Sequence, residues 1–255
     1  MSTPPTADNG QVTVQIADGI ATLSFSHPKG NSLPGSVLAQ LAAEVTRLGT
    51  NPDAAVIVLR SEGTGPFCAG ASFQELQAVR TPEQGKRFFL GFAKLILAMT
   101  RCPKFIIARV HGKAVGGGVG VCAASDYALA VPGASVKLSE LAVGIGPFVV
   151  GPVIERKIGL AAFSALAVDA MEWRVAEWGR EHGLYAEVRD SVEEMDQAIA
   201  ELASRLASFN PEAMMQMKRA FWQGTEHWDT LLEERAEMSG RLVLSEFARK
   251  AISAK

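Results

Sequence analysis

Two glycine-rich stretches and one glutamate are the parts of this sequence whose residue types and spacing could do chemistry. The first stretch is residues 63–72, GTGPFCAGAS, and the second is residues 111–126, which contain the triplet Gly116-Gly117-Gly118. Consecutive glycines are poor in regular elements, because each loses more backbone freedom on folding than alanine does. We interpret both stretches as places where bare backbone N–H groups approach a ligand. One amide from each would form an oxyanion hole, which stabilises charge developing on a carbonyl oxygen.

Glu140 is the candidate acid or base. It follows a predicted short strand, residues 135–138, in a neighbourhood rich in glycine and apolar residues. A carboxyl group there would be partly desolvated, which raises its pKa toward the range useful for proton transfer at neutral pH. Glu75 and Asp126 also lie near the two stretches. For each of these acids alone, the default interpretation is helix capping or hydration.

Other chemistries have little support. The four histidines, His27, His111, His182 and His227, are scattered, which argues against a histidine triad or a metal site. The three cysteines are also far apart, which indicates a reducing compartment: Cys68, Cys102 and Cys122. Residues 118–123, GVGVCA, formally match a dinucleotide fingerprint. However, that match begins eight residues past Val110, where the preceding strand ends, which is too far for the required tight turn.

Composition narrows the class of protein. The chain has 255 residues with 48% hydrophobic and 20% charged residues, typical of an ordinary globular protein with a sizeable core. A net charge of −2 gives no electrostatic case for nucleic acid or for an anionic membrane surface. The first ten residues lack a signal-peptide pattern, and glycines and prolines interrupt the longest apolar run, residues 141–154. We expect a soluble, cytoplasmic protein.

The elements that position these residues follow an alternating order. The pattern predicts a hairpin of strands 12–16 and 20–25 with Asp18-Gly19 in its turn, a helix from about Pro34, a strand at 55–60, and a helix at 81–100. Thr81 would cap that helix, and its buried stripe would include Phe88, Phe89 and Phe92. A strand at 104–110, short strands at 127–131 and 135–138, and a helix at 147–159 should follow, and then helix after helix from Leu160, one of them capped by Ser191, to a final charged helix. Strand, glycine loop and helix occur twice, at 55–100 and 104–125. We therefore predict an α/β core at residues 1–190 and a helical region at 191–255.

Residues 63–76 and 111–126 resemble the two signature loops of the crotonase (enoyl-CoA hydratase/isomerase) superfamily. The resemblance extends from Ile20 to about Pro211 and includes the loop at 28–33. It implies a crotonase-like spiral of ββα units with an acyl-CoA site, followed by a C-terminal helical trimerisation region. It also implies a homo-trimer or a dimer of trimers (a hexamer). The substrate would be an acyl-CoA thioester from fatty acid metabolism, and no metal or cofactor is implied, since CoA enters as part of the substrate.

The resemblance also implies roles for individual residues. Ala71 and Gly117 would supply the two oxyanion amides that stabilise a thioester enolate, and Glu140 would transfer protons. Substrate would be bound by Lys29, Ala69, Ala71, Ser72, Phe73, Gln74, Gly116 and Gly117. Phe148 and the tryptophans near the C-terminus could belong to the pocket or to a subunit contact.

Two positions depart from the family pattern. Ser72 stands where aspartate is usual, which we interpret as a change either in helix capping or in the side chains that support the site residues. Gly120 stands where two-carboxylate hydratases carry their second glutamate, so one acid/base group is missing. Since one carboxylate can remove a proton from C2 and return it at C4, we favour double-bond isomerisation through Glu140. The stretch at 138–148 also resembles that of Δ3,Δ2-enoyl-CoA isomerases. The alternatives are a hydratase (lyase) using Glu140 and a positioned water, or a catalytically inactive acyl-CoA-binding protein.

Overall fold

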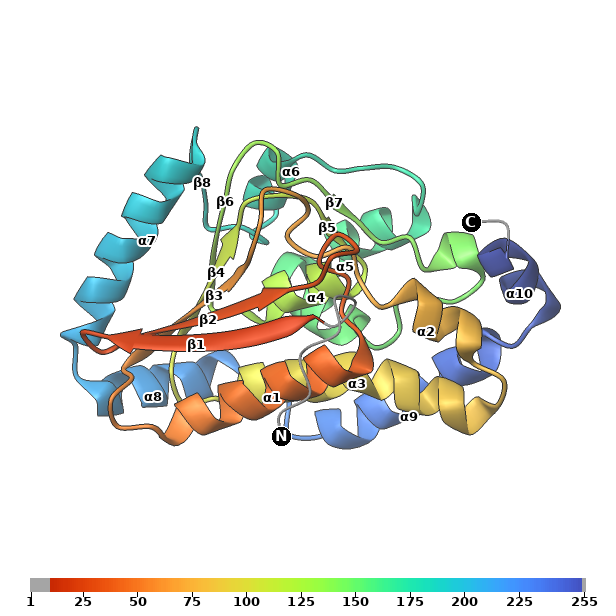
Figure 1. Ribbon diagram of the computed structural model, residues 1–255, viewed down its shortest axis with the longest axis horizontal. Helices are drawn as coiled ribbons and strands as arrows, with labels where there is room; N and C mark the ends of the chain where they lie inside the picture. Colours follow the sequence, from red (N-terminus) through yellow and green to blue (C-terminus); the bar gives the residue numbers. More distant parts are fainter. Residues whose placement is uncertain (1–9, 254–255) are drawn as a thin grey trace, which may run out of the picture.

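A computed structural model describes residues 10–253 of the chain, and its centre is one mixed sheet (Figure 1). The sheet has the strand order β1-β2-β3-β4-β6-β8, and all neighbours are parallel except the β1-β2 hairpin. Its strands are β1 (Gln11–Ala17), β2 (Ile20–Ser26), β3 (Val56–Ser61), β4 (Ile106–Val110), β6 (Tyr127–Ala130) and β8 (Glu187–Val188). The predicted hairpin turn is present, with Asp18 and Gly19 at φ angles of 52° and 78°.

A second, two-stranded sheet pairs β5 (Ala114–Val115) with β7 (Val136–Lys137) in parallel. This pairing joins the glycine triplet to the segment that precedes Glu140, because each stands immediately after one of the two strands. Two isolated β-bridges add the first glycine loop to this arrangement. Cys68 of that loop pairs with Ala114 of β5, and Ala71 pairs with Leu33 of the loop at 28–33. Residues that are far apart in the sequence are thereby held at one place.

Side chains of the main sheet alternate between two cores. Ile57 and Leu59 of β3 face the larger core, which helices α1 (Gly35–Thr50), α3 (Pro82–Arg101), α4 (Gly117–Ala124) and α5 (Gly151–Val168) cover. Val56 and Val58 face the smaller core beneath α7 (Val192–Ala207), which lies along one side of the sheet in Figure 1. Strands buried on both faces explain why residues 55–60 have no polar alternation.

Several helix starts confirm the sequence analysis. Thr81 Oγ1 accepts a hydrogen bond from the Gln84 amide at the start of α3, with Pro82 in the first turn. Ser191 Oγ does the same for the Glu194 amide at the start of α7. These local caps stabilise helix ends without help from tertiary packing, which is why the sequence predicts them.

The sequence analysis was wrong or incomplete at other elements. The helix predicted at 147–159 is the first part of α5, and it begins later than predicted, at Gly151, because Pro152 is tolerated only in a first turn. Gly159 has non-helical angles (φ 77°, ψ 159°), so this first helical segment ends where the sequence predicts, and a second segment continues α5 beyond the kink. The region predicted as purely helical from Leu160 contains strand β8, and the single final helix is two, α9 (Trp228–Leu242) and α10 (Glu246–Ser253). The short helix α2 (Phe73–Ala78) was not predicted, whereas α6 (Ala176–Glu181) lies in the region predicted as helical.

The C-terminal helices pack closely on the rest of the chain. A β-carbon at Gly85 of α3 would lie 2.6 Å from the Gly240 Cα, so these glycines allow α3 and α9 to touch. From α8 (Pro211–Phe221), Lys218 inserts a fully buried ammonium 2.6 Å from an Asp126 carboxylate oxygen. The Trp222 indole N–H donates to the other Asp126 oxygen at 3.3 Å. This buried pair ties α8 to the end of α4.

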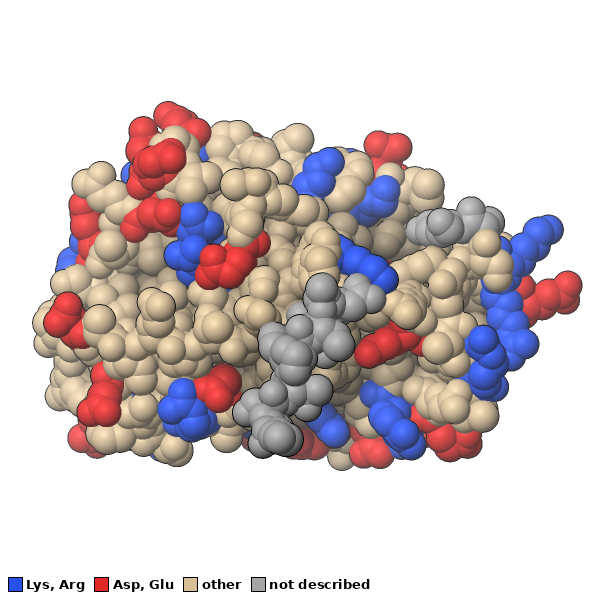
Figure 2. Space-filling view, viewed as in Figure 1, with Lys and Arg blue, Asp and Glu red and all other residues tan. Residues whose placement is uncertain are grey.

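The surface shows side chains of both charges on the face in Figure 2, in keeping with the small net charge of −2. Among residues 10–253, no helix combines the length and the apolar character needed to cross a membrane.

Candidate active site

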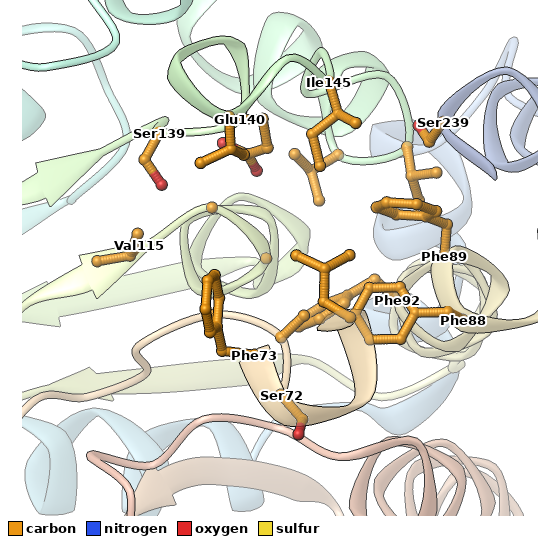
Figure 3. A pocket seen from close by; sticks show the side chains of 18 of the residues that line it. Ser72, Phe73, Phe88, Phe89, Phe92, Val115, Ser139, Glu140, Ile145 and Ser239 are labelled. Atoms are coloured by element: carbon orange, nitrogen blue, oxygen red, sulfur yellow. The ribbon is translucent and has the colours of Figure 1, made fainter. Parts of the chain in front are cut away.

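A single large cavity of about 710 Å³ brings the predicted site residues together. Its lining includes all ten residues that the sequence analysis placed in the site: Lys29, Ala69, Ala71, Ser72, Phe73, Gln74, Gly116, Gly117, Glu140 and Phe148. Figure 3 shows Glu140 and Ile145 on one side of the cavity, Phe73 opposite them, and the phenylalanines of α3 toward one end. Helix α2 and the start of α4 both contribute residues to its lining.

The Ala71 amide is available to a ligand. In the bridge to Leu33, the Leu33 N–H donates to the Gly70 carbonyl at 2.8 Å and the Ser72 N–H donates to the Leu33 carbonyl at 3.3 Å. Successive amides of an extended segment point in opposite directions. The N–H of Ala71 therefore points away from Leu33, and within the described chain it has no backbone acceptor.

The Gly117 amide is available for a different reason. Gly117 is the first residue of α4, and the first amides of a helix have no acceptor within the helix. Gly116 precedes it with φ at 53°, a conformation that favours glycine. A β-carbon at Gly117 would lie 2.2 Å from the Phe92 ring, so this position also requires glycine for space. The start of α4 adds a positive helix-dipole end at the cavity.

Glu140 directs its carboxylate at this same place. A β-carbon at Gly116 would lie 2.7 Å from Glu140 Oε1, which puts the carboxylate against the start of α4. Its Oε2 is buried and has no hydrogen-bond partner among the described residues. Burial raises the pKa of Glu140 to about 7, which confirms the direction that the sequence predicts. At neutral pH the group can therefore accept a proton and release it.

The open side of the cavity is polar. The Lys29 ammonium donates to Gln74 Oε1 at 3.0 Å, which joins the loop at 28–33 to helix α2. Ser72 Oγ accepts from the Glu75 amide at 3.3 Å and caps α2, so the departure at Ser72 is a capping change, the first of the two that we expected. The Glu75 carboxylate in turn accepts from the Gly35 amide at 2.9 Å.

The opposite end of the cavity is apolar, and sequence reasoning missed most of it. Phe88, Phe89 and Phe92 were predicted as part of the buried stripe of α3, and only Phe92 is buried while all three line the cavity. Further apolar lining comes from residues that include Leu76, Val143, Ile145, Val149 and Val150. The sequence gave no periodic signal for these lining residues, because the loop at 139–150 has neither the helix period nor the strand period.

Gly120 lies outside the cavity lining, and its surroundings explain the missing acid. A β-carbon at Gly120 would lie 2.8 Å from Val150 Cγ1 and 3.6 Å from Ile96 Cδ1. Apolar side chains therefore fill the space that a second carboxylate would enter. Among the described residues that line the cavity, Glu140 is the only carboxylate.

The chain is similar in sequence and in fold to known proteins. Residues 15–252 match the family model for enoyl-CoA hydratase/isomerase. The chain is 31% identical to mitochondrial methylglutaconyl-CoA hydratase of Rattus norvegicus, over 82% of this chain and 67% of that protein. It is 26% identical to short-chain-enoyl-CoA hydratase of Clostridium acetobutylicum, over 92% of this chain and 90% of that protein. A crystal structure of an enoyl-CoA hydratase from Mycobacterium avium superposes with a TM-score of 0.85 at 25% identity, covering 95% and 94% of the two chains.

The family match and the fold together place the chain among the acyl-CoA enzymes of the crotonase superfamily. Within that class, the chain belongs to the enoyl-CoA hydratase/isomerase family.

Proposed function

We propose that this protein moves the double bond of an enoyl-CoA thioester, with Glu140 as the only group that carries the proton. The observation that supports this most directly is the apolar filling at Gly120, where Val150 leaves no room for a second carboxylate. Hydration is most simply served by two acid/base groups, whereas migration of a double bond needs one. The pKa of about 7 for Glu140 suits a group that must accept and then release the same proton.

The proposed reaction has two proton transfers. Glu140 removes a proton from C2 of a 3-enoyl thioester, and the electron pair moves through the carbonyl to give an enolate. The amides of Ala71 and Gly117 donate to the enolate oxygen, and losing one such donor costs about 2.7–4 kcal/mol of transition-state stabilisation. Glu140 then returns the proton to C4, which leaves the 2-enoyl thioester. The reaction involves no net oxidation. We therefore propose that it needs no cofactor beyond the CoA that is part of the substrate.

The proposed substrate position follows from the two ends of the cavity. The thioester carbonyl would lie between the two amides, and the CoA portion would leave past Lys29, Ala69 and residues 72–74. The acyl chain would extend toward Phe88 and Phe89.

A hydratase is the second candidate, because the relatives named above are hydratases. In that case Glu140 would activate a positioned water that adds at C3. Purified protein should be incubated separately with 3-enoyl-CoA and 2-enoyl-CoA thioesters, and the products separated by liquid chromatography. Conversion of the 3-enoyl to the 2-enoyl thioester supports the isomerase, and hydration of the 2-enoyl thioester without migration supports the hydratase. Binding of both thioesters without turnover would identify an inactive acyl-CoA-binding protein.

We also propose that the protein forms a homo-trimer or a dimer of trimers. Large apolar side chains are exposed beyond the end of α5, with Val168 74%, Met171 66% and Val175 61% accessible in the single chain. Burying such side chains against another copy would be favourable. Size-exclusion chromatography with light scattering would measure the mass, and a monomer at micromolar concentration would contradict the proposal.

A further inference from the structure

Ser239 of α9 has a buried hydroxyl that nothing in the described chain satisfies. Its side chain lines the cavity, the residue is 1% exposed, and its Oγ has no hydrogen-bond partner. A serine within a helix can bond to the carbonyl four residues earlier, but Ser239 Oγ does not. Buried hydroxyls without a partner are costly, and each one calls for an explanation.

The position of Ser239 connects the hydroxyl to substrate. Figure 3 shows Ser239 next to Phe89 and Ile145, at the end of the cavity away from Val115 and Ser139. This is the apolar end, where the proposed function puts the far part of the acyl chain. The hydroxyl is therefore an isolated polar group on an apolar wall, and it is fixed in place by the close crossing of α9 over α3 at Gly85 and Gly240.

We propose that Ser239 determines specificity, by hydrogen-bonding a neutral oxygen, a ketone or a hydroxyl, near the far end of the acyl chain. This inference rests on the proposed acyl-CoA site. A ketone oxygen would accept from the Ser239 O–H, and a substrate hydroxyl could also donate to Oγ.

The charges around the cavity favour a neutral oxygen over a carboxylate. Among the described lining residues, the charged ones are Lys29 and Glu140. Lys29 is held by Gln74, so the described cavity lining offers no other cation to compensate a carboxylate buried beside Ser239. Burying an unpaired charge costs far more than burying a bonded carbonyl.

Equilibrium binding tests the inference without depending on turnover. Saturated acyl-CoA thioesters of four to ten carbons would be titrated in matched pairs, one with a plain alkyl end and one with a ketone on the penultimate carbon. We expect the ketone member to bind about ten-fold more tightly at the chain length that reaches Ser239, the effect of one neutral hydrogen bond. Ser239→Ala should remove that preference, while the matched control Ser164→Ala, which removes an exposed hydroxyl from α5, should keep it.

Thermal unfolding without ligand provides a second readout. Because Ser239 Oγ has no partner in the free protein, Ser239→Ala should unfold at the same temperature as the wild type or higher. A clear loss of stability would mean that the hydroxyl is bonded within the protein, and it would overturn the inference. Equal binding of both members at every chain length in the wild type would overturn it too, while leaving the acyl-CoA site intact. If no thioester bound at all, the proposed function would fail together with it.

Discussion

Val150 fills the space beside Gly120: a β-carbon added at Gly120 would lie 2.8 Å from Val150 Cγ1 and 3.0 Å from Val150 Cβ. Both residues are buried, and Val150 immediately precedes α5. The space that a carboxylate side chain at position 120 would enter is thus occupied by an apolar side chain from the facing segment. Placing an acid at position 120 would therefore require a smaller side chain at position 150 as well.

The Gly120 and Val150 pair can be tested by restoring the acid. Gly120→Glu alone should lower the free energy of unfolding by about 1–3 kcal/mol, because its side chain overlaps Val150. Gly120→Glu combined with Val150→Ala should recover stability and gain measurable hydration of a 2-enoyl thioester. Unfolding in urea and product analysis would measure the two effects. A single variant as stable as the wild type would show that Val150 does not fill this space.

Glu140→Gln should lower kcat for the proposed isomerisation by about 10²–10⁴-fold, since an amide cannot carry the proton. The KM should change little, because the amides and the cavity walls remain. Glu75→Gln is the matched control: Glu75 bonds the Gly35 amide and lies outside the cavity lining, so its activity should be retained. Steady-state kinetics with a 3-enoyl thioester would compare them, and full activity of Glu140→Gln would remove Glu140 from its proposed role.

The pH dependence of activity should follow Glu140. Its pKa is about 7 and the base must be ionised to take the first proton, so kcat/KM should fall about ten-fold per pH unit below pH 7. The decline should be absent from the residual activity of Glu140→Gln. A profile that is flat from pH 5 to 8 would contradict an ionised Glu140 as the base.

The free energy of unfolding should also depend on the ionisation of Glu140, and it should fall as pH rises, whereas activity should increase. Because burial raises the pKa of Glu140 from 4.5 to about 7, the folded protein binds more protons than the unfolded chain between these values. The free energy of unfolding therefore falls as pH rises through this window, by at most about 3 kcal/mol. Glu140→Gln should be as stable as the wild type near pH 4.5 and more stable at pH 8. Unfolding in urea at both pH values would measure the stability of the two proteins. An equal difference between them at pH 4.5 and at pH 8 would contradict the prediction.

Lys218→Ala should destabilise the protein by about 3–5 kcal/mol, because it leaves the Asp126 carboxylate buried without its cation. The control is Lys86→Ala on α3, whose ammonium lies 2.7 Å from Glu233 at the surface, and the expected loss is below about 1 kcal/mol. Both would be measured by urea unfolding at one protein concentration. Similar losses for the two variants would contradict a structural role for the buried pair.

Local signals account for what the sequence predicted well. The Asp18-Gly19 turn, the Thr81 cap and the apolar run at 55–60 act over a few residues, so their outcome does not depend on distant contacts. The family resemblance supplied the rest of the candidate site, since the signature loops name Ala71 and Gly117 directly.

Contacts between distant segments account for what could not be predicted. Strand β8 has two residues and forms only because β6 offers its edge. Val150 and Gly120 meet through the packing of α4 with the segment before α5, which neither local pattern encodes. Ser239 reaches the cavity because α9 crosses α3 through two glycines, and a serine in an amphipathic helix gives no sign of that in isolation.

The wall contributed by α9 has a consequence for synthesis of the protein. A ribosome-bound chain that stops before Trp228 already carries Glu140 and both amides, yet the far end of its cavity lacks Ser239. In such a chain, that end of the cavity would be open to solvent. The wall of the cavity is therefore complete only once the chain includes α9.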